Sequence, residues 1–311
     1  MAAQKIQLVA ILLCTYNGEK FLEEQLNSLE AQTYQNWVVI ASDDGSSDNT
    51  LAILKKFQAK WPVGKLTIRN GPQQGFCRNF LSLACDSKIK ADYYAFCDQD
   101  DVWLPEKLEV SVQAIVKHER EFIQILYCGR TKYVSDALKL IGGSPLFVFP
   151  PSFRNALVQS IAGGNTMVFN IPLKLLIERA GIVDVPSHDW WIYQLVTGVN
   201  GAVIYDSNAY LLYRQHEFSL VGGNTSFIAK IYRIRMLLQG RFQKWNAQNI
   251  SALNKVDYLF IKNNQEILRM FEVLRRAHLK DRIRLIMVCG LYRQTRGGTL
   301  SLFLAALFKK I

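Results

Sequence analysis

Short apolar runs that alternate with helical patterns constrain this 311-residue chain more than any other feature. The runs cover residues 8–13, 37–40, 66–68 and 93–97, and each is typical of a strand buried on both faces. Between them, apolar residues recur at helical spacing, and a further helix is expected over 104–117. This alternation predicts an α/β fold, with a mostly parallel sheet and helices on both of its faces. Ligands of such sheets bind beyond the carboxyl ends of the strands.

Charge divides the chain into two parts. Residues 1–224 hold 20 Lys/Arg and 22 Asp/Glu, whereas residues 225–311 hold 17 Lys/Arg and 4 Asp/Glu. We therefore expect a near-neutral α/β domain over 1–224 and a basic, amphipathic helical tail over 225–311. Half of the residues are apolar, which excludes a disordered or low-complexity chain. The six cysteines form no CxxC pair, which favours free thiols in a reducing compartment over a zinc cluster.

The basic tail has several candidate partners. Its apolar residues predict one helix over 227–238 and a second, longer helix whose stripe is Val256, Phe260, Ile267, Phe271 and Leu274. The stripes either lie in the interface of an anionic membrane or pack on the α/β domain. The aromatic residues are not interleaved as a stacking platform, so we expect no nucleic-acid partner. The longest apolar stretch near the end, 300–308, is too short to span a bilayer, which predicts a soluble or peripheral protein.

Polar clusters follow the first two expected strands. Thr15, Asn17 and Glu19 come after the first, and residues 42–50 (SDDGSSDNT) come after the second. Carboxylates at strand ends accept hydrogen bonds from a base or from ribose hydroxyls. Capping of the following helix by Asp48 or Asn49 is the alternative. The chain has no GxGxxG motif and no P-loop, which argues against a dinucleotide-binding fold.

Three carboxylates follow the fourth expected strand, in Asp98-Gln99-Asp100-Asp101. Such a group suits a hard divalent cation, Mn²⁺ or Mg²⁺, although an ordinary acidic turn is the alternative. In extended backbone Asp98 and Asp100 point the same way, whereas Asp101 points the other way and would cap the helix near Pro105.

Two later clusters carry further candidates. Asp189 stands between His188 and two tryptophans, which makes it a candidate general base; a cap for a helix over 190–196 is the alternative. In Tyr213-Arg214-Gln215-His216, Arg214 is a candidate phosphate contact and His216 a candidate metal ligand. The glycine-rich segment 162–166 either lines a donor or acceptor pocket or forms a plain turn.

Taken in order, CTYNGEKFLEEQLNSLEAQTYQNW, SDDGSSDNT, FCDQDDVWLPEKLE and HDWW resemble glycosyltransferase family 2 with its GT-A fold. The resemblance covers roughly residues 6–220, and DQDDVW, HDWW and YRQH together resemble its rhamnosyltransferase-like branch. It implies a nucleotide-sugar site built from Thr15, Asn17, Glu19, Asp43, Asp44, Arg78, Asp98 and Gln99. It also implies Asp100 as the direct metal ligand, joined by Asp98 and His216, and Asp189 as the catalytic base. His188 departs from the Glu or Asp that many relatives carry before the base.

The activity implied is inverting sugar transfer by single displacement. The expected donor is dTDP-rhamnose and the expected acceptor a hydroxyl of a glycan or lipid-linked acceptor in cell-surface polysaccharide synthesis, with Mn²⁺ or Mg²⁺ as cofactor. The enzyme would work in the cytoplasm, peripheral on the inner face of the membrane. The alternatives are a UDP-hexose donor, an inactive family member, or a sugar-1-phosphate nucleotidyltransferase. The last needs a glycine-rich and basic loop after the first strand, which residues 15–19 lack.

Overall fold

The computed structural model describes residues 7–215 and 241–311, and these fall into two compact units. Within the described residues, the first unit comprises 7–145, 162–182 and 202–215. The second comprises 146–161, 183–201 and 241–311. The domain boundary expected at 224/225, like the helix expected over 227–238, lies outside the described residues, so both stay predictions.

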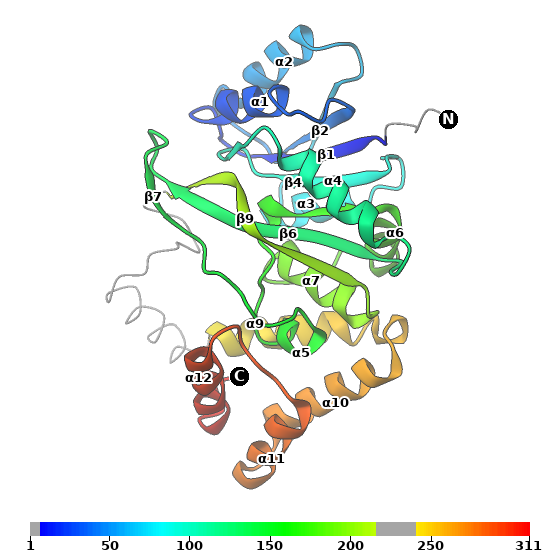
Figure 1. Cartoon of the computed structure of the whole chain (residues 1–311), viewed down its shortest axis with the longest axis vertical. Helices are drawn as coiled ribbons and strands as arrows, with labels where there is room; N and C mark the ends of the chain where they lie inside the picture. The colour runs from blue at the N-terminus through cyan, green and yellow to red at the C-terminus, as the bar shows by residue number, and fades with distance from the viewer. Residues whose placement is uncertain (1–6, 216–240) are drawn as a thin grey trace. The chain divides into compact units, whose positions relative to one another are not determined.

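The first unit contains the expected parallel strands. Strands β1 (Val9–Thr15), β2 (Trp37–Asp43), β3 (Leu66–Asn70) and β4 (Tyr93–Cys97) pair in the order β3-β2-β1-β4, and all three pairs are parallel. The connecting helices are α1 (Leu22–Glu30), α2 (Thr50–Lys60) and α3 (Phe76–Ala84). Since the carboxyl ends of these strands share one edge, the polar clusters of the sequence meet there (Figure 1).

The sheet continues beyond β4 with mixed pairing, in the order β4-β8-β6-β9-β5 with β7 paired to β6. The long strands β6 (Ile125–Val134) and β9 (Ala202–Arg214) run parallel, side by side (Figure 1). The short strands β5 (Val102–Trp103), β7 (Leu140–Gly143) and β8 (Val168–Asn170) pair antiparallel with their neighbours.

Helices cover both faces of the sheet, as the sequence predicted. The apolar residues of α1, α2 and α4 (Lys107–His118) form one core cluster with Ile11, Trp37 and Trp103. On the other face, Phe80 of α3 contacts Phe96 of β4, with ring centroids 5.3 Å apart. The segments Gly164–Thr166 (η1) and α6 (Ile171–Ala180) complete this unit. The fold is therefore the α/β class that the alternating pattern indicated.

The beginning of α4 corrects one expectation. The helix begins at Lys107 with Glu106 at its N-cap, so residues 104–106 lie outside it. Asp101 does not cap this helix. Its carboxylate is fully buried and accepts a hydrogen bond from Asn165 Nδ2 at 2.7 Å. Asp101 is therefore bonded to a residue distant in the sequence and not to the beginning of α4.

Among the described residues, the second unit is helical. Its elements are α5 (Phe153–Ala156), α7 (His188–Gly198), α9 (Arg241–Leu253), η2 (Asp257–Leu259), α10 (Lys262–Arg276), α11 (Leu279–Cys289) and α12 (Arg296–Leu307). The longer helix is confirmed over 262–276, where Ile267, Phe271 and Leu274 are buried, but it does not extend through Val256 and Phe260, which flank η2 before α10. Across the described ranges, no helix is both long and apolar enough to cross a bilayer.

Contacts inside this unit join α7 to the C-terminal helices. Asn264 donates from Nδ2 to the carbonyls of Thr197 and Gly198, each at 3.0 Å. A Cβ at Gly198 would lie 2.7 Å from the Phe260 ring, so this glycine permits the close approach. Asn264 of α10 and Phe260 thus pack against the C-terminal end of α7.

Candidate functional site

The ends of β1 and β2 are tied by one buried hydrogen bond. Thr15 Oγ1 donates to Asp43 Oδ1 at 2.8 Å, and both side chains are buried. Asp43 also accepts from the main-chain N–H and the hydroxyl of Ser46, at 2.9 and 2.6 Å. Asp43 therefore shapes the turn after β2 and orders two of the predicted donor-binding residues against each other.

Asp44, the next residue, shapes a different loop. Its carboxylate accepts from the main-chain N–H groups of Gln73 at 2.6 Å and Gly75 at 2.8 Å. A Cβ at Gly71 would lie 2.8 Å from Asp44 Oδ1, so this approach requires glycine. The loop leads into α3, whose first turn carries the half-buried Arg78. The acidic motif after β2 thereby positions the predicted basic contact.

Hydrogen bonds join the loop after β1 to the beginning of α2. Asn17, in a left-handed backbone conformation with φ +48°, accepts from Ser47 N at 2.9 Å. Glu19 accepts from the main-chain N–H of Asn49 at 3.0 Å. Asp48 accepts from Thr50 N at 3.0 Å, but the N-cap position of α2 is Asn49, whose side chain makes no capping bond, so Asp48 is not the helix cap. Burial alone raises the pKa of Asp48, but hydrogen bonds from Thr50 and Glu19 outweigh it and lower this pKa.

Gln99 joins the loops after β1 and β4. Its Oε1 accepts from Tyr16 N at 2.8 Å, and its Nε2 donates to Tyr16 O at 2.9 Å. A Cβ at Gly18 would lie 2.3 Å from Gln99 Oε1. The paired bonds resemble those between residues of adjacent β-strands. They hold the loop after β1 and the loop after β4 in a fixed relation.

The acidic segment after β4 separates its three carboxylates by burial. Asp98 and Asp100 are half-buried, whereas Asp101 is fully buried. Burial, followed by the charges of Asp100 and Asp98, raises the pKa of Asp101 well above its usual value. The bond from Asn165 places the glycine-rich segment 162–166 beneath the acidic segment, as a support built on a 3₁₀ turn.

The donor set fits a divalent cation in kind. Asp98 and Asp100 offer hard oxygen ligands, and Mg²⁺ is usually held by one or two carboxylates together with substrate phosphates. Within residues 7–215 and 241–311, no group of three His, Cys, Asp or Glu side chains is arranged to hold a metal. His216, the third predicted ligand, lies outside the described residues.

Arg214 has a role that the sequence did not reveal. Its guanidinium is fully buried, and Nε donates to the carbonyl of Asp100 at 2.8 Å. The other two nitrogens bond to the carbonyl of Asp136 and to the carboxylate of Glu24. The expectation that Arg214 contacts a phosphate is therefore wrong, since its three nitrogens are used inside the fold. An arginine at the end of a strand carried no signal of this arrangement.

Lys107 lies behind the acidic segment as a second buried cation. Its Nζ is 3.5 Å from the centroid of the Trp103 ring and, among the described residues, has no hydrogen-bond partner. Burial lowers the pKa of Lys107 to about 7, while Cys97 and Asp101 act in the opposite direction. No motif in the sequence singles out this lysine.

Asp189 belongs to the second unit, where it lies in the first turn of α7. The helix begins at His188, so Asp189 is inside it and Ser187 takes the N-cap position. Its Oδ1 accepts from the N–H of Trp190 at 2.7 Å, and the positive end of the helix dipole favours a carboxylate there. The neighbouring His188 is buried, which lowers its pKa to about 4 against the opposing charge of Asp189.

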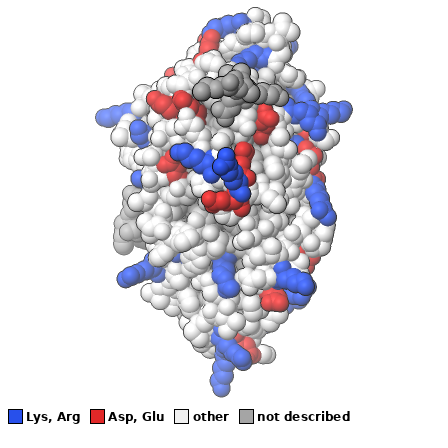
Figure 2. Space-filling model, turned by 45° about the vertical axis from the view of Figure 1, so that its right-hand side comes forward, with Lys and Arg blue, Asp and Glu red and all other residues white. Residues whose placement is uncertain are grey.

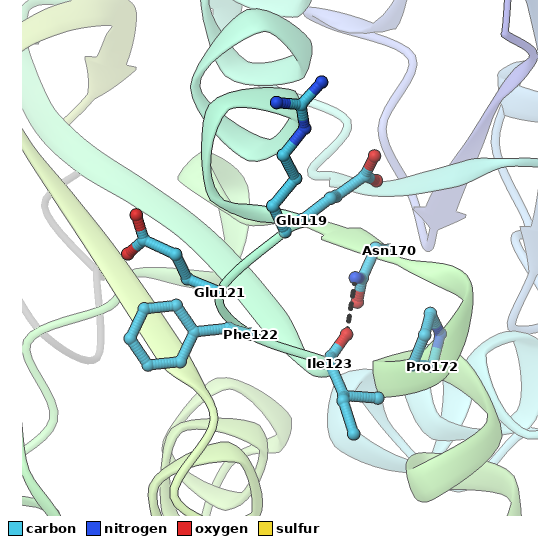
Figure 3. Close-up of a pocket in the computed structure, with 7 residues that line it drawn as sticks. Glu119, Glu121, Phe122, Ile123, Asn170 and Pro172 are labelled. Atoms are coloured by element: carbon cyan, nitrogen blue, oxygen red, sulfur yellow. Dashed lines mark hydrogen bonds between the residues drawn. The ribbon is translucent and has the colours of Figure 1, made fainter.

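A cavity of about 370 Å³ in the first unit lies away from these clusters. Figure 3 shows Glu119, Glu121, Phe122, Ile123 and Pro172 around it, with Asn170 bonded to the carbonyl of Ile123 at 2.8 Å. Asn170 pairs with Tyr93, the first residue of β4, whereas the acidic segment follows the last residue of that strand. The cavity is thus at the amino edge of β4, opposite the predicted donor site.

Comparisons with known proteins identify the family of this chain. Residues 10–162 match the family model described as glycosyl transferase family 2. A dTDP-rhamnosyl transferase of Shigella flexneri is 29% identical, over 81% of this chain and 87% of the relative. An uncharacterized glycosyltransferase of Rickettsia typhi is 30% identical, over 82% of this chain and 78% of the relative.

Two solved structures share the fold at low sequence identity. The mannosyltransferase PcManGT of Pyrobaculum calidifontis, in complex with GDP-Man and Mn²⁺, has a TM-score of 0.54 at 16% identity, covering 98% of this chain and 87% of its own. TarS of S. aureus (residues 1–349), in complex with UDP-GlcNAc, has a TM-score of 0.51 at 17% identity, covering 96% and 81%. These two structures show the GT-A fold, and the family match together with the 30% identical relative shows the family: the chain is a GT-A glycosyltransferase and belongs to glycosyl transferase family 2.

Proposed function

We propose that this glycosyltransferase moves rhamnose from dTDP-rhamnose, with inversion, to a hydroxyl of a glycan or lipid-linked acceptor. The observation that carries the proposal is the set of polar side chains interlocked at the carboxyl ends of β1, β2 and β4 through the bonds Thr15–Asp43 and Gln99–Tyr16. The similarity to the Shigella dTDP-rhamnosyl transferase along most of both chains supports the choice of donor.

Donor binding is assigned to two kinds of residue. Thr15, Asn17, Glu19, Asp43 and Gln99 hold the three loops in place through the hydrogen bonds described above, so they act largely by shaping the site. Asp44, Arg78 and Asp98 complete the set, with Asp44 orienting the loop before the helix that carries Arg78. A guanidinium near the diphosphate offers charge-assisted hydrogen bonds to its oxygens.

Asp100, Asp98 and His216 are assigned to a Mn²⁺ or Mg²⁺ ion. When bound, the ion neutralises charge that develops on the departing diphosphate. The buried Arg214 keeps the main chain at Asp100 in position, and Asp101 anchors the segment to Asn165. These contacts hold the main chain around Asp100 before donor and metal arrive, which limits the entropy lost on binding.

Asp189 is assigned the role of general base. The acceptor hydroxyl is a weak nucleophile near neutral pH, so a carboxylate must take its proton as the oxygen attacks the anomeric carbon. The bond from Trp190 N to Oδ1 holds one oxygen of Asp189 and fixes the orientation of the carboxylate. The second oxygen is the one that we assign to the acceptor.

The cellular setting follows from the acceptor. We place the enzyme in the cytoplasm, with the basic region 225–311 on the anionic inner face of the membrane, in cell-surface polysaccharide synthesis. Clustered Lys and Arg residues near anionic lipid each contribute about 1 kcal/mol to binding. Removing this region is a poor test, because α7 shares its core with α10.

A donor panel tests the proposal. The full chain is incubated with dTDP-rhamnose and with several UDP- and GDP-sugars, with and without Mn²⁺, and donor hydrolysis and thermal shift are measured. We expect dTDP-rhamnose to give the largest response and Mn²⁺ to increase it. A preference for a UDP-hexose would reject the rhamnosyl assignment and retain the family activity.

Two variants test the assigned roles. Asp189→Asn should reduce turnover about 10²–10⁴-fold while leaving donor binding intact, which is the usual contribution of a general base. Asp184→Asn, an exposed acid shortly before α7, is the matched control and should remain active. Asp100→Ala should abolish the response to Mn²⁺. Near-normal turnover of Asp189→Asn, or an unchanged metal response of Asp100→Ala, would contradict the respective role.

A further inference from the structure

Helices α11 and α12 each expose a row of large apolar side chains. On α11 the row is Leu279, Ile283 and Met287, which are 42–61% exposed. On α12 and the residue that follows it, the row is Leu300, Leu304 and Phe308, which are 47–73% exposed. Residues four apart lie on one face of a helix, so each row forms a continuous apolar stripe.

The opposite faces of the same helices are buried, so the rows are not the core of this region. Ile286 and Cys289 of α11 and Leu302 of α12 are at most 2% exposed. The buried Arg282 donates from Nη1 to the carbonyls of Ala306 and Leu307, at 2.9 and 3.0 Å, and so satisfies the end of α12. Because the buried faces of both helices are held by these contacts, the two apolar rows face solvent.

Basic residues border both rows. Between 279 and 311 the chain has seven Lys/Arg and a single acid, Asp281. Lys280 and Arg284 each follow a residue of the α11 row, and Lys309 and Lys310 follow Phe308. Figure 2 shows Lys and Arg side chains, with a few acidic side chains beside them, on otherwise uncharged surface at the lower end of the view. Apolar rows edged with cations are typical of helices that lie in the interface of an anionic bilayer.

A cavity of about 670 Å³ opens at the beginning of the α12 row. It is lined by Phe149, Pro150, Tyr292, Arg293, Arg296 and Thr299. Arg296 lies four residues before Leu300, on the same side of α12. Arg293 lies 5.8 Å from the centroid of the Phe242 ring and has no carboxylate partner among the residues that the structure describes. Two arginines with aromatic and proline walls suit a phosphate that carries a hydrocarbon chain.

We propose that the two rows act together as a membrane-docking surface, and that the cavity at the beginning of the α12 row takes the phosphate of an anionic phospholipid. The inference rests on the proposed function in one respect: docking would bring the enzyme to its lipid-linked acceptor. A second copy of the chain is disfavoured as the occupant, because the cations that border the rows would then face one another.

Flotation of the full chain with vesicles tests the proposal. Vesicles of phosphatidylglycerol and phosphatidylcholine should carry the protein, and vesicles of phosphatidylcholine alone should carry much less. Leu300→Ser with Leu304→Ser should weaken binding about tenfold or more, since each buried leucine contributes substantially to insertion. Arg293→Gln with Arg296→Gln should reduce binding only to the anionic vesicles. Ile261→Ser with Val273→Ser, which alters exposed apolar residues of the same unit, is the control and should bind like the parent.

Other outcomes would overturn the docking surface. Equal flotation of the leucine variant and the control is one, and a parent dimer that the leucine variant converts to monomers without affecting flotation is another. Donor hydrolysis without vesicles is measured on every protein and should not change in the surface variants. If hydrolysis is absent from the parent while flotation behaves as expected, the proposed activity fails and the docking surface stands.

Discussion

Arg214 lies opposite Asp100 and donates from Nε to its main-chain carbonyl at 2.8 Å. The register of β5 and β9 explains this position, because Val102 pairs antiparallel with Leu212, two residues before Arg214. The guanidinium also bonds to Asp136 and Glu24, so one buried side chain joins the acidic segment to α1 and to the turn after β6. The predicted metal ligand is thus held through its backbone by a residue 114 positions away.

Arg214→Ala should destabilise the first unit by about 2–3 kcal/mol, because it empties a buried space and removes the donor of two main-chain carbonyls, as well as the partner of the half-exposed Glu24. Donor affinity should fall with it, since the Asp100 segment loses its support. Urea unfolding and donor titration measure the two effects. Arg120→Ala, an exposed arginine, should change neither. A loss of stability as small as that of the control would show that the contact is not needed.

Gly18→Ala should displace Gln99, because the new Cβ would lie 2.3 Å from Gln99 Oε1. Steric overlap of this kind costs about 1–3 kcal/mol and breaks the paired bonds to Tyr16. Adding Gln99→Ala should restore stability without restoring donor affinity, which separates the overlap from the lost tie. Gly297→Ala has open space around the new Cβ and serves as the control. Full donor affinity in Gly18→Ala would refute the role of this tie.

Asn165→Ala should cost about 1–3 kcal/mol of stability, because the buried Asp101 carboxyl loses the donor bonded at 2.7 Å. The acidic segment should also become more mobile, so hydrogen exchange of residues 98–103 should increase. Asn263→Ala, an exposed asparagine of the second unit, is the control and should leave both measurements unchanged. Unchanged exchange in Asn165→Ala would mean that the segment does not depend on this bond.

The buried His188 should make the protein less stable in mild acid. Its pKa is lowered to about 4 from 6.5 by burial, so between these values the unfolded chain binds a proton that the folded protein does not. The free energy of unfolding should fall by on the order of 1–3 kcal/mol as pH drops from 6.5 to 4. His188→Gln should remove this part of the pH dependence, and His278→Gln, at an exposed site, should not. Identical pH profiles of the two variants would contradict the prediction.

The buried Lys107 should make the stability of the protein depend on pH above neutrality. Its pKa is lowered from 10.5 to about 7 by burial, so the unfolded chain binds more protons between these values and stability should rise with pH. Lys107→Met should be more stable than the parent at pH 7 and should lose that rise. Lys117→Met, at an exposed position of the same helix, should keep it. The free energy of unfolding of both variants is measured at several pH values. The same rise in Lys107→Met as in Lys117→Met would contradict the prediction.

The sequence alone determined the elements whose signals are local. The strand expected over 93–97 has the bounds of β4, and the polar clusters occupy the strand ends that the alternating pattern assigned to them. Both follow from side-chain periodicity, which neighbouring residues express without help from the rest of the chain. The short strands β5, β7 and β8 carry too few residues for a period to appear, so the mixed pairing beyond β4 could not be predicted.

Only the tertiary structure decided how the acidic segment is held. Asp101 was expected to cap a helix and Arg214 to contact a phosphate, and each instead serves a partner far along the chain. The same holds for the helix expected through Val256 and Phe260, which packing on α7 divides before α10. The physical reason is common to all three: a buried polar group or ring takes the partner that burial brings within reach, and sequence spacing records only local alternatives.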